Sequence, residues 1–334
     1  MNSLKIYGAE DMRWEESEKP TLEAGQVLLR VHYVGICGSD LHYYFHGDNG
    51  GNVIREPFTP GHELSATIAE DPDNEWKVGT KVTVHPARFG EKDDRSPQRP
   101  YLWAGGDYLG SASCFPHRQG GAAEYIAVDR AMIRALPEGL GLKEASLAEP
   151  LAVALHAVNI GNDVIGDRAL VLGGGPIGLL VAAALKEKGV KDVALGDIQE
   201  AALERGKSLG VDETFHIGVE QVPDGSYPVV FECSAAAPSL TQAIKSVYPG
   251  GVVVQVGTLP NAEIKVNLAP LVSKEVQLRG TLRFNTEIDD AISILHKNPT
   301  IVDVVTHEFP AEEAVEAFNI AKNSAASGKV LIHF

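Results

Sequence analysis

Cysteine is scarce in this chain of 334 residues, which contains only Cys37, Cys114 and Cys233. Three widely separated cysteines cannot form the framework of paired disulfides that holds small secreted proteins together. The amino-terminal sequence MNSLKIYGAE also lacks the long apolar segment of a secretory signal. We therefore expect a protein of a reducing compartment, the cytoplasm.

Long hydrophobic runs and an excess of positive charge are also absent. No window approaches the roughly 20 consecutive apolar residues that a membrane-spanning helix needs. Lys and Arg number 29 against 45 Asp and Glu, so the formal net charge is −16. Such a charge repels the phosphates of nucleic acids and of anionic membranes. The composition therefore predicts that neither nucleic acid nor membrane is a partner.

The hydrophobic pattern changes along the chain, whose length is comfortable for two domains. Residues 1–145 contain short, partly alternating runs such as GQVLLRVHYVG and KVTVHPA, which predict a β-rich barrel or sandwich. Residues 88–106 carry charge, proline and glycine without periodicity and predict a long, mobile surface loop. In residues 146–283, strand-like and helix-like runs alternate, which predicts a parallel sheet. Residues 284–334 end on the strand-like KVLIHF, which we expect to return to the first domain.

The motifs GICGSDLHYY and PGHE contain three residue types that bind zinc. Cys37 offers a thiolate, His62 an imidazole and Glu63 a carboxylate, and three such ligands leave one tetrahedral position open, as in a catalytic zinc site. The fold must bring them together, because they are not paired locally as the CxxC cysteines of a zinc finger are. Taken singly, each residue also has a purely structural explanation, as a core thiol, a hydrogen-bonded imidazole or a solvated carboxylate.

The run VLGGGPIG follows an apolar strand and precedes a helix, which is the context of a dinucleotide-binding turn. Its glycines permit a tight turn, close approach of the backbone to a pyrophosphate, and close packing of helix on strand. Asp197 ends the next strand, where a carboxylate binds both ribose hydroxyls and repels a 2′-phosphate, so NAD is favoured over NADP. The motif comprises Gly173, Gly175, Pro176, Ile177 and Gly178.

Glu149 stands at the start of the apolar helix predicted over AEPLAVALHA. A carboxylate at this position compensates the positive end of the helix dipole, or it acts at the metal. The sequence leaves both roles open.

Together these motifs resemble those of the zinc-dependent medium-chain dehydrogenases, over nearly the whole chain. Within that family, GSASCFPHRQGG, VVFECS, VQVG and LRGTLRF are most similar to L-idonate 5-dehydrogenases and next to sorbitol dehydrogenases. The resemblance implies an α/β fold with a GroES-like, β-rich catalytic domain and a doubly wound, parallel-sheet (Rossmann) cofactor domain. It also implies a homo-oligomer, a dimer or tetramer.

The resemblance implies roles for individual residues. Cys37, His62 and Glu63 match the zinc ligands, and Glu149 matches a carboxylate that binds the metal directly or through its water. Ser39 matches the hydroxyl at the start of the proton relay, and His42 is the candidate for its next step. Asp40 matches the carboxylate that holds the ligand histidine in its proper tautomer. Tyr43 and Arg283 match positions that polyol dehydrogenases use near the substrate. The residues in segments that approach the nicotinamide are Val256, Gly257, Thr281, Leu282 and Arg283.

Three departures from the family pattern stand out. Many relatives carry four cysteines that bind a structural zinc, whereas residues 85–113 contain none, so we expect one catalytic zinc per chain. Ala202 stands where relatives that use NAD often have an arginine, so the ribose and phosphate contacts must differ. Phe284 replaces a tyrosine common in sorbitol dehydrogenases, which leaves the exact polyol open.

The implied activity is hydride transfer between NAD and a secondary hydroxyl of a sugar acid or polyol. Oxidation of L-idonate to 5-ketogluconate is the leading candidate, because the guanidinium of Arg283 can bind a carboxylate by donating two parallel hydrogen bonds. A sorbitol- or xylitol-type polyol dehydrogenase is the alternative, in which Arg283 contacts only the cofactor. Two other classes stay open: a zinc hydrolase using bound hydroxide, and a nonenzymatic dinucleotide-binding protein.

Overall fold

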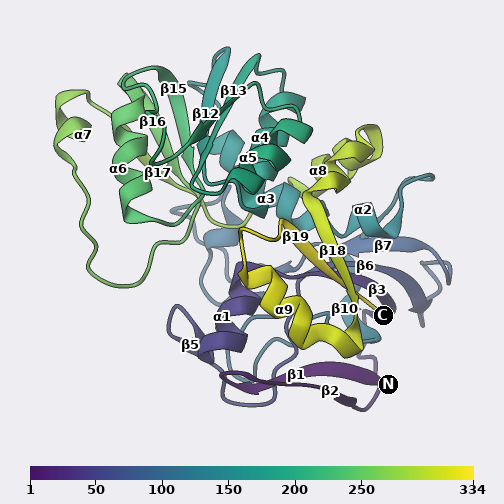
Figure 1. Ribbon diagram of the computed structural model, residues 1–334. Coiled ribbons are helices and arrows are strands. Elements are labelled where there is room, and N and C mark those ends of the chain that lie inside the picture. Colours follow the sequence, from purple (N-terminus) through teal and green to yellow (C-terminus); the bar gives the residue numbers. More distant parts are fainter. The chain divides into compact units, whose positions relative to one another are not determined.

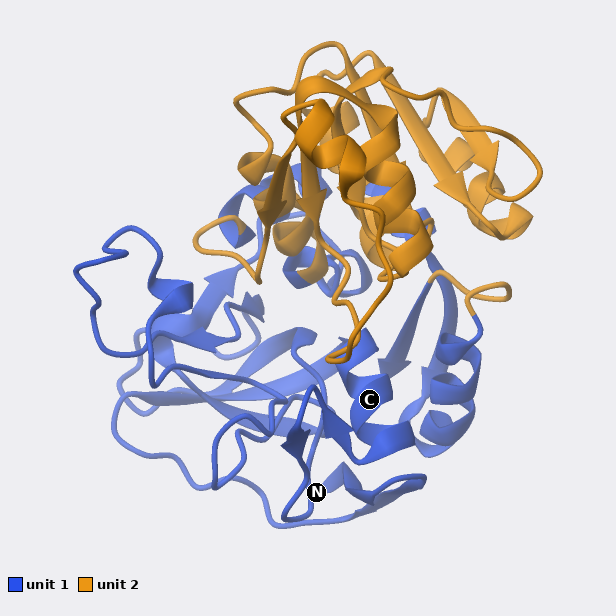
Figure 2. Ribbon diagram, turned by 90° about the vertical axis from the view of Figure 1, so that its left-hand side faces the viewer, with its two compact units in different colours: residues 1–149, 288–323, 329–334 blue, residues 150–287, 324–328 orange.

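The computed structural model describes residues 1–334 and divides them into two compact units (Figure 2). Unit 1 comprises Met1–Glu149, Ile288–Asn323 and Lys329–Phe334, and unit 2 comprises Pro150–Glu287 and Ser324–Gly328. Both main boundaries lie a few residues after those expected from the sequence. No helix has the length and apolar character needed to cross a membrane.

The main sheet of unit 1 has seven strands, namely β3 (Gln26–Gly35), β6 (Glu63–Glu70), β7 (Lys81–Val84), β10 (Tyr125–Asp129), β11 (Ile133–Ala135), β18 (Val305–Pro310) and β19 (Lys329–His333). Six follow the order β11-β7-β6-β3-β19-β18, and β10 also pairs with β3 (Figure 1). The apolar side chains Val27, Leu29 and Val31 of β3 lie in the core. Strand β19 pairs antiparallel with β3, so the end of the chain completes a sheet formed near its beginning.

The other elements of unit 1 surround this sheet. Its two-stranded ladders are β1 (Asn2–Gly8) with β2 (Asp11–Glu16), β4 (Asp48–Asn49) with β5 (Asn52–Val53), and β8 (Ala87–Arg88) with β9 (Asp107–Tyr108). Its helices are α1 (Gly38–His46), α2 (Leu142–Ala145), α8 (Ile288–Lys297) and α9 (Ala314–Lys322), with 3-10 turns η1 (Pro100–Leu102), η2 (Arg130–Met132), η3 (Pro299–Val304) and η4 (Ala311–Glu313). Between β8 and β9 the only regular element is η1, in agreement with the predicted loop.

Unit 2 contains a sheet of six parallel strands, β12 (Arg168–Leu172), β13 (Asp192–Asp197), β14 (Glu213–His216), β15 (Tyr227–Glu232), β16 (Val247–Gln255) and β17 (Gln277–Gly280). The order is β14-β13-β12-β15-β16-β17. In chain order this is 3-2-1-4-5-6, the arrangement of dinucleotide-binding sheets. The predicted α/β fold with a parallel cofactor-domain sheet is therefore confirmed.

Helix α3 (Ala148–Ile160) begins at the end of unit 1 and precedes β12. Helices also follow four of the strands: α4 (Pro176–Glu187), α5 (Glu200–Ser208), α6 (Ala237–Ser246) and α7 (Ala269–Ser273), whereas β14 leads to β15 without a helix. All six residues of β15 are buried, so both faces of the central sheet are covered. Helix α4 begins with a proline at its first position, where a missing backbone N–H costs no hydrogen bond. The glycine turn between β12 and α4 therefore lies where the sequence predicts it.

Candidate active-site residues

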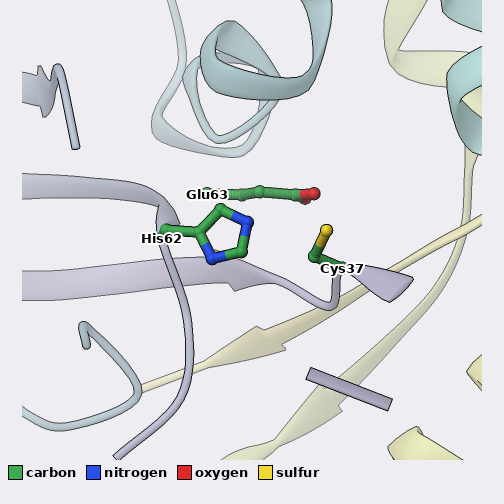
Figure 3. A group of neighbouring side chains, drawn as sticks. All are labelled: Cys37, His62 and Glu63. Atoms are coloured by element: carbon green, nitrogen blue, oxygen red, sulfur yellow. The ribbon is translucent and has the colours of Figure 1, made fainter. Parts of the chain in front are cut away.

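The three predicted zinc ligands lie together in unit 1. Their donor atoms, one from each of Cys37, His62 and Glu63, all lie within 4.8 Å of one another. Cys37 is the residue before α1, His62 precedes β6, and Glu63 is the first residue of β6. Figure 3 shows the three side chains converging from these separate segments. The structure thus brings together residues that the sequence separates.

Two glycines make this convergence possible. Gly35 lies opposite Glu63 in the β3–β6 pair, and a Cβ atom there would lie 2.1 Å from Glu63 Oε2. Gly61, just before His62, has a φ of +95°, and its Cβ would lie 2.7 Å from a methyl carbon of Val34. A larger residue at either position would push a ligand-bearing segment away, because side chains tolerate neither the positive φ nor the close contact.

The donor set fits a zinc ion. His62 is 7% and Glu63 1% exposed. His62 Nδ1 is buried without a hydrogen-bond partner, and Glu63 Oε2 lies 2.7 Å from the ammonium nitrogen of Lys329. Burial by itself lowers the pKa of His62, but the nearby charge of Cys37, its hydrogen bond and the charge of Asp40 raise that pKa to about 10. The groups around His62 therefore stabilise positive charge at this position. Sulfur, nitrogen and oxygen donors gathered in one cluster are the ligands that Zn²⁺ prefers.

Lys329 is a member of the site that the sequence analysis missed. It is 2% exposed, and its Nζ donates to Glu63 Oε1 at 2.7 Å and to the carbonyl of Ile36 at 3.0 Å. The only signal in the sequence was a lysine at the start of the apolar terminal run KVLIHF. The pairing of β19 with β3 brings this lysine to the ligand cluster.

Asp40 supports the backbone of two ligand segments. Its carboxylate is 1% exposed and accepts hydrogen bonds from the N–H groups of Cys37, at 2.9 Å, and Gly61, at 3.2 Å. Burial raises its pKa, and the charge of His62 opposes that rise. The expected hydrogen bond to the ring of His62 is not formed, since Nδ1 has no partner. Asp40 therefore acts on the imidazole as a nearby charge.

Glu149 lies in unit 1 and is 4% exposed. Its Oε1 accepts a hydrogen bond of 2.6 Å from the hydroxyl of Tyr108, a residue that the sequence analysis did not select. Burial raises the pKa of Glu149, and the charge of His62 lowers it. Glu149 stands outside the group of three clustered donors but within electrostatic reach of two of them, His62 and Glu63. Its role at the metal stays a prediction.

The residues that follow Cys37 occupy different surroundings on α1. Ser39 is half-buried in the first turn, and His42 is exposed, with its ring 5.6 Å from that of His46. Tyr43 is 1% exposed, and its hydroxyl accepts a hydrogen bond of 3.0 Å from the N–H of Ala112. The hydroxyl of Tyr43 therefore has a structural partner, and its contact with substrate stays a prediction.

The glycine turn of unit 2 shows the close backbone contacts expected of a dinucleotide-binding turn. Gly173 has a φ of +104°, and a Cβ there would lie 2.7 Å from the backbone nitrogen of Ser234. A Cβ on Gly175 would meet nothing within 4 Å, so the backbone is open there for a ligand. A Cβ on Gly178 would lie 1.8 Å from the Gly173 carbonyl oxygen, so only glycine lets the helix pack this closely.

The other predicted cofactor residues follow the carboxyl ends of neighbouring strands. The strand pairing places Leu172, Glu232, Gln255 and Gly280 in one row across the sheet. Dinucleotides bind outside this edge of such sheets. The residues beyond the row are Val256 and Gly257 after β16, and Thr281, Leu282 and Arg283 after β17.

Asp197 ends β13 beside the glycine turn. Its Oδ2 accepts a hydrogen bond of 2.6 Å from Gly174 N–H, and its Oδ1 accepts one of 2.7 Å from Gln199 N–H. These bonds hold the carboxylate at the edge of the sheet where a ribose binds in this fold.

Comparisons with known proteins match two parts of the chain to known domains. Residues 23–138 match the alcohol dehydrogenase GroES-like domain, and residues 176–297 match the zinc-binding dehydrogenase domain. Sorbitol dehydrogenase of Mus musculus is 34% identical over 349 aligned residues, which cover 99% of this chain and 95% of that protein.

Solved structures also match over the full length. L-idonate 5-dehydrogenase from Escherichia coli superposes with a TM-score of 0.93 at 28% identity, covering 100% of this chain and 98% of that one. An alcohol dehydrogenase from Escherichia coli complexed with NADH gives a TM-score of 0.88 at 25% identity, covering 100% and 99%.

A parallel sheet of the dinucleotide-binding order in one unit, and a cluster of a half-buried cysteine with a buried histidine and glutamate in the other, are the features of a metal-dependent dehydrogenase. The chain belongs to the zinc-binding, medium-chain alcohol dehydrogenase family. It is an oxidoreductase whose cofactors are zinc and NAD(P), and its substrate is a small molecule.

Proposed function

We propose that this protein uses one zinc ion and NAD to oxidise a secondary hydroxyl of a sugar acid or polyol, with L-idonate, oxidised at C5, as the leading substrate. The observation that carries the proposal is the group formed by half-buried Cys37 and buried His62 and Glu63, whose donor atoms lie within 4.8 Å of one another. Three protein ligands leave the fourth tetrahedral position of zinc for a substrate oxygen.

Zinc, when bound, supplies a Lewis acid that lowers the pKa of a substrate hydroxyl, and bound NAD accepts a hydride. The residues of α1 remove the proton. Ser39 is half-buried and His42 is exposed, and residues three apart on a helix lie on neighbouring positions of one face. Ser39 accepts the hydroxyl proton and passes it to His42, whose ring releases it to solvent.

Asp197 favours NAD over NADP. Its carboxylate is held at the end of β13 by the N–H groups of Gly174 and Gln199. From that position it binds the ribose hydroxyls of NAD, while its negative charge repels the 2′-phosphate of NADP. Ala202 contributes no cation to offset this repulsion.

Arg283 supports a sugar acid as substrate. It is a non-glycine residue with a φ of +50°, an uncommon conformation that often occurs at ligand-binding positions. A guanidinium binds a carboxylate through two parallel, charge-assisted hydrogen bonds. The likeness to L-idonate 5-dehydrogenase agrees with this role. The identity with sorbitol dehydrogenases favours a neutral polyol as the second candidate, in which Arg283 contacts only the cofactor.

A screen of NAD reduction tests the proposal. NADH formation is measured with idonate, gluconate, sorbitol, xylitol and threonine, before and after removal of zinc by a chelator. We expect the highest kcat/KM with idonate, loss of activity without zinc, and recovery when zinc is restored. A preference for sorbitol or xylitol would select the polyol function. Absence of an NADH fluorescence change on mixing the protein with NADH would instead favour a zinc hydrolase.

A further inference from the structure

Tyr108 contacts two residues of the metal site at once. Its hydroxyl donates to Glu149 Oε1 at 2.6 Å, and its ring meets that of His62 edge to face, with centroids 5.5 Å apart and planes at 69°. Tyr108 is 5% and Glu149 4% exposed, so this hydrogen bond is buried. One side chain therefore links a predicted zinc ligand to the carboxylate whose role at the metal is open.

The position of Tyr108 is set by the chain around it. It is the last residue of β9, where it lies opposite Ala87 of β8. The preceding residue, Asp107, lies 3.6 Å from Arg88 and 3.7 Å from Arg118. Arg88 in turn binds Asp129 through a hydrogen bond of 2.7 Å. These ion pairs close the long loop at its base and hold Tyr108 at the site.

We propose that Tyr108 is a positioning residue for the metal site, which acts by holding Glu149. Its hydroxyl donates a hydrogen bond to Glu149 Oε1. This bond sets the orientation in which the carboxylate acts at zinc, directly or through a water. The proposal rests on the proposed zinc-dependent function. Partners of this kind orient metal ligands, and their removal typically costs about 10–100-fold in metal affinity.

Tyr108→Phe isolates the hydroxyl. Phenylalanine keeps the ring and its contact with His62, and removes the hydroxyl that donates to Glu149. A matched control is Tyr227→Phe in unit 2, because Tyr227 is also buried and its hydroxyl also donates to a glutamate, Glu213, at 3.5 Å. Both variants lose one tyrosine hydroxyl, but only one loses it at the metal site.

The measurement is zinc affinity, by competition with a chelator, on protein whose folding is checked by circular dichroism. We expect Tyr108→Phe to bind zinc about tenfold more weakly, and Tyr227→Phe to match the wild type. Unchanged affinity in Tyr108→Phe overturns the proposal. A wild type that binds no zinc instead overturns the proposed function, so the two failures are distinguishable.

Glu149→Gln then tests whether Tyr108 acts through Glu149. We expect this substitution alone to weaken zinc binding, and the addition of Tyr108→Phe to cause little further loss, because the two residues act as one unit. An equal loss from Tyr108→Phe in both backgrounds overturns the proposal, since Tyr108 would then act without Glu149. A normal zinc affinity in Glu149→Gln overturns it as well.

Discussion

The two sites of this protein are built in different ways. In unit 2 the glycine turn, the helix that follows it and Asp197 belong to one strand–helix–strand segment, β12 to β13. In unit 1 the ligand cluster draws on residues as far apart as Cys37 and Lys329. The first depends on short-range backbone geometry, and the second on strand pairing across the chain. Substitutions should therefore have different effects on the glycine-turn site of unit 2 and on the ligand cluster of unit 1.

The largest expected effect comes from removing a zinc ligand. Cys37→Ala should abolish zinc binding and lower kcat/KM by about 10⁴-fold, because the Lewis acid contributes several kcal/mol to the transition state. Metal analysis should give one zinc per wild-type chain and none in the variant. Cys114→Ala is the control, since Cys114 lies outside the cluster, and it should retain zinc. Two zinc ions per wild-type chain would contradict the single site.

Removing Lys329 should destabilise unit 1. Lys329→Met leaves Glu63 as a buried charge without its cation, which costs about 4 kcal/mol in the free energy of unfolding. Urea denaturation of the zinc-free protein measures this loss. Lys143→Met is the control, because its pair with Glu308 is about one-third exposed and contributes about 1 kcal/mol or less. Equal losses in the two variants would mean that the buried Lys329–Glu63 pair contributes no more to stability than the more exposed Lys143–Glu308 pair.

Unit 2 also contains a buried carboxylate, Glu287. Its lowered pKa predicts that the free energy of unfolding depends on pH. Burial raises the pKa of Glu287, but hydrogen bonds from His156 and from Asn285 N–H outweigh burial and bring the pKa down to about 2. A carboxyl whose folded pKa is depressed stabilises the fold above its unfolded pKa of about 4.5, and this stabilisation is lost as the pH falls toward the folded value.

Comparison of the wild type with Glu287→Gln tests this. Unfolding free energies should differ by about 3 kcal/mol above pH 5, and the difference should shrink as the pH falls toward 2. A difference that does not change with pH would show that the charge of Glu287 is not responsible.

Arg283→Ala sharpens the substrate assignment. The variant should lose roughly 2–4 kcal/mol in kcat/KM with idonate, through the loss of a charge-assisted contact. Sorbitol oxidation should fall less, because a neutral polyol gains less from a guanidinium. Steady-state kinetics with both substrates gives the answer. Equal losses would assign Arg283 to the cofactor and place sorbitol or xylitol ahead of idonate.

The smallest expected effect concerns the choice of cofactor. Asp197→Ala removes a ribose contact and a repulsion against the 2′-phosphate, so the preference for NAD over NADP should relax by about 1–2 kcal/mol. The ratio of kcat/KM for the two cofactors measures this change, and Asp192→Ala at the other end of β13 is the control. An unchanged ratio in Asp197→Ala would contradict the assignment.

The glycine turn and the parallel sheet could be predicted from the sequence because their causes are local. Gly173 needs a positive φ, and Gly178 must pack against the Gly173 carbonyl only a turn away. The alternation of apolar strands and helices likewise reports which faces are buried. Candidate zinc ligands could also be selected by residue type, because few side chains bind zinc; the structure brings Cys37, His62 and Glu63 together, and their binding of zinc stays a prediction.

Only the tertiary structure showed which side chains contact the predicted metal site. Lys329 reaches Glu63 because β19 pairs with β3, and Tyr108 reaches Glu149 because β8 and β9 close a loop. Neither contact follows from hydrophobic periodicity, which states that a residue is buried but not what it touches. A lysine or tyrosine in an apolar run is compatible with many neighbours, and strand pairing between distant segments selects one of them.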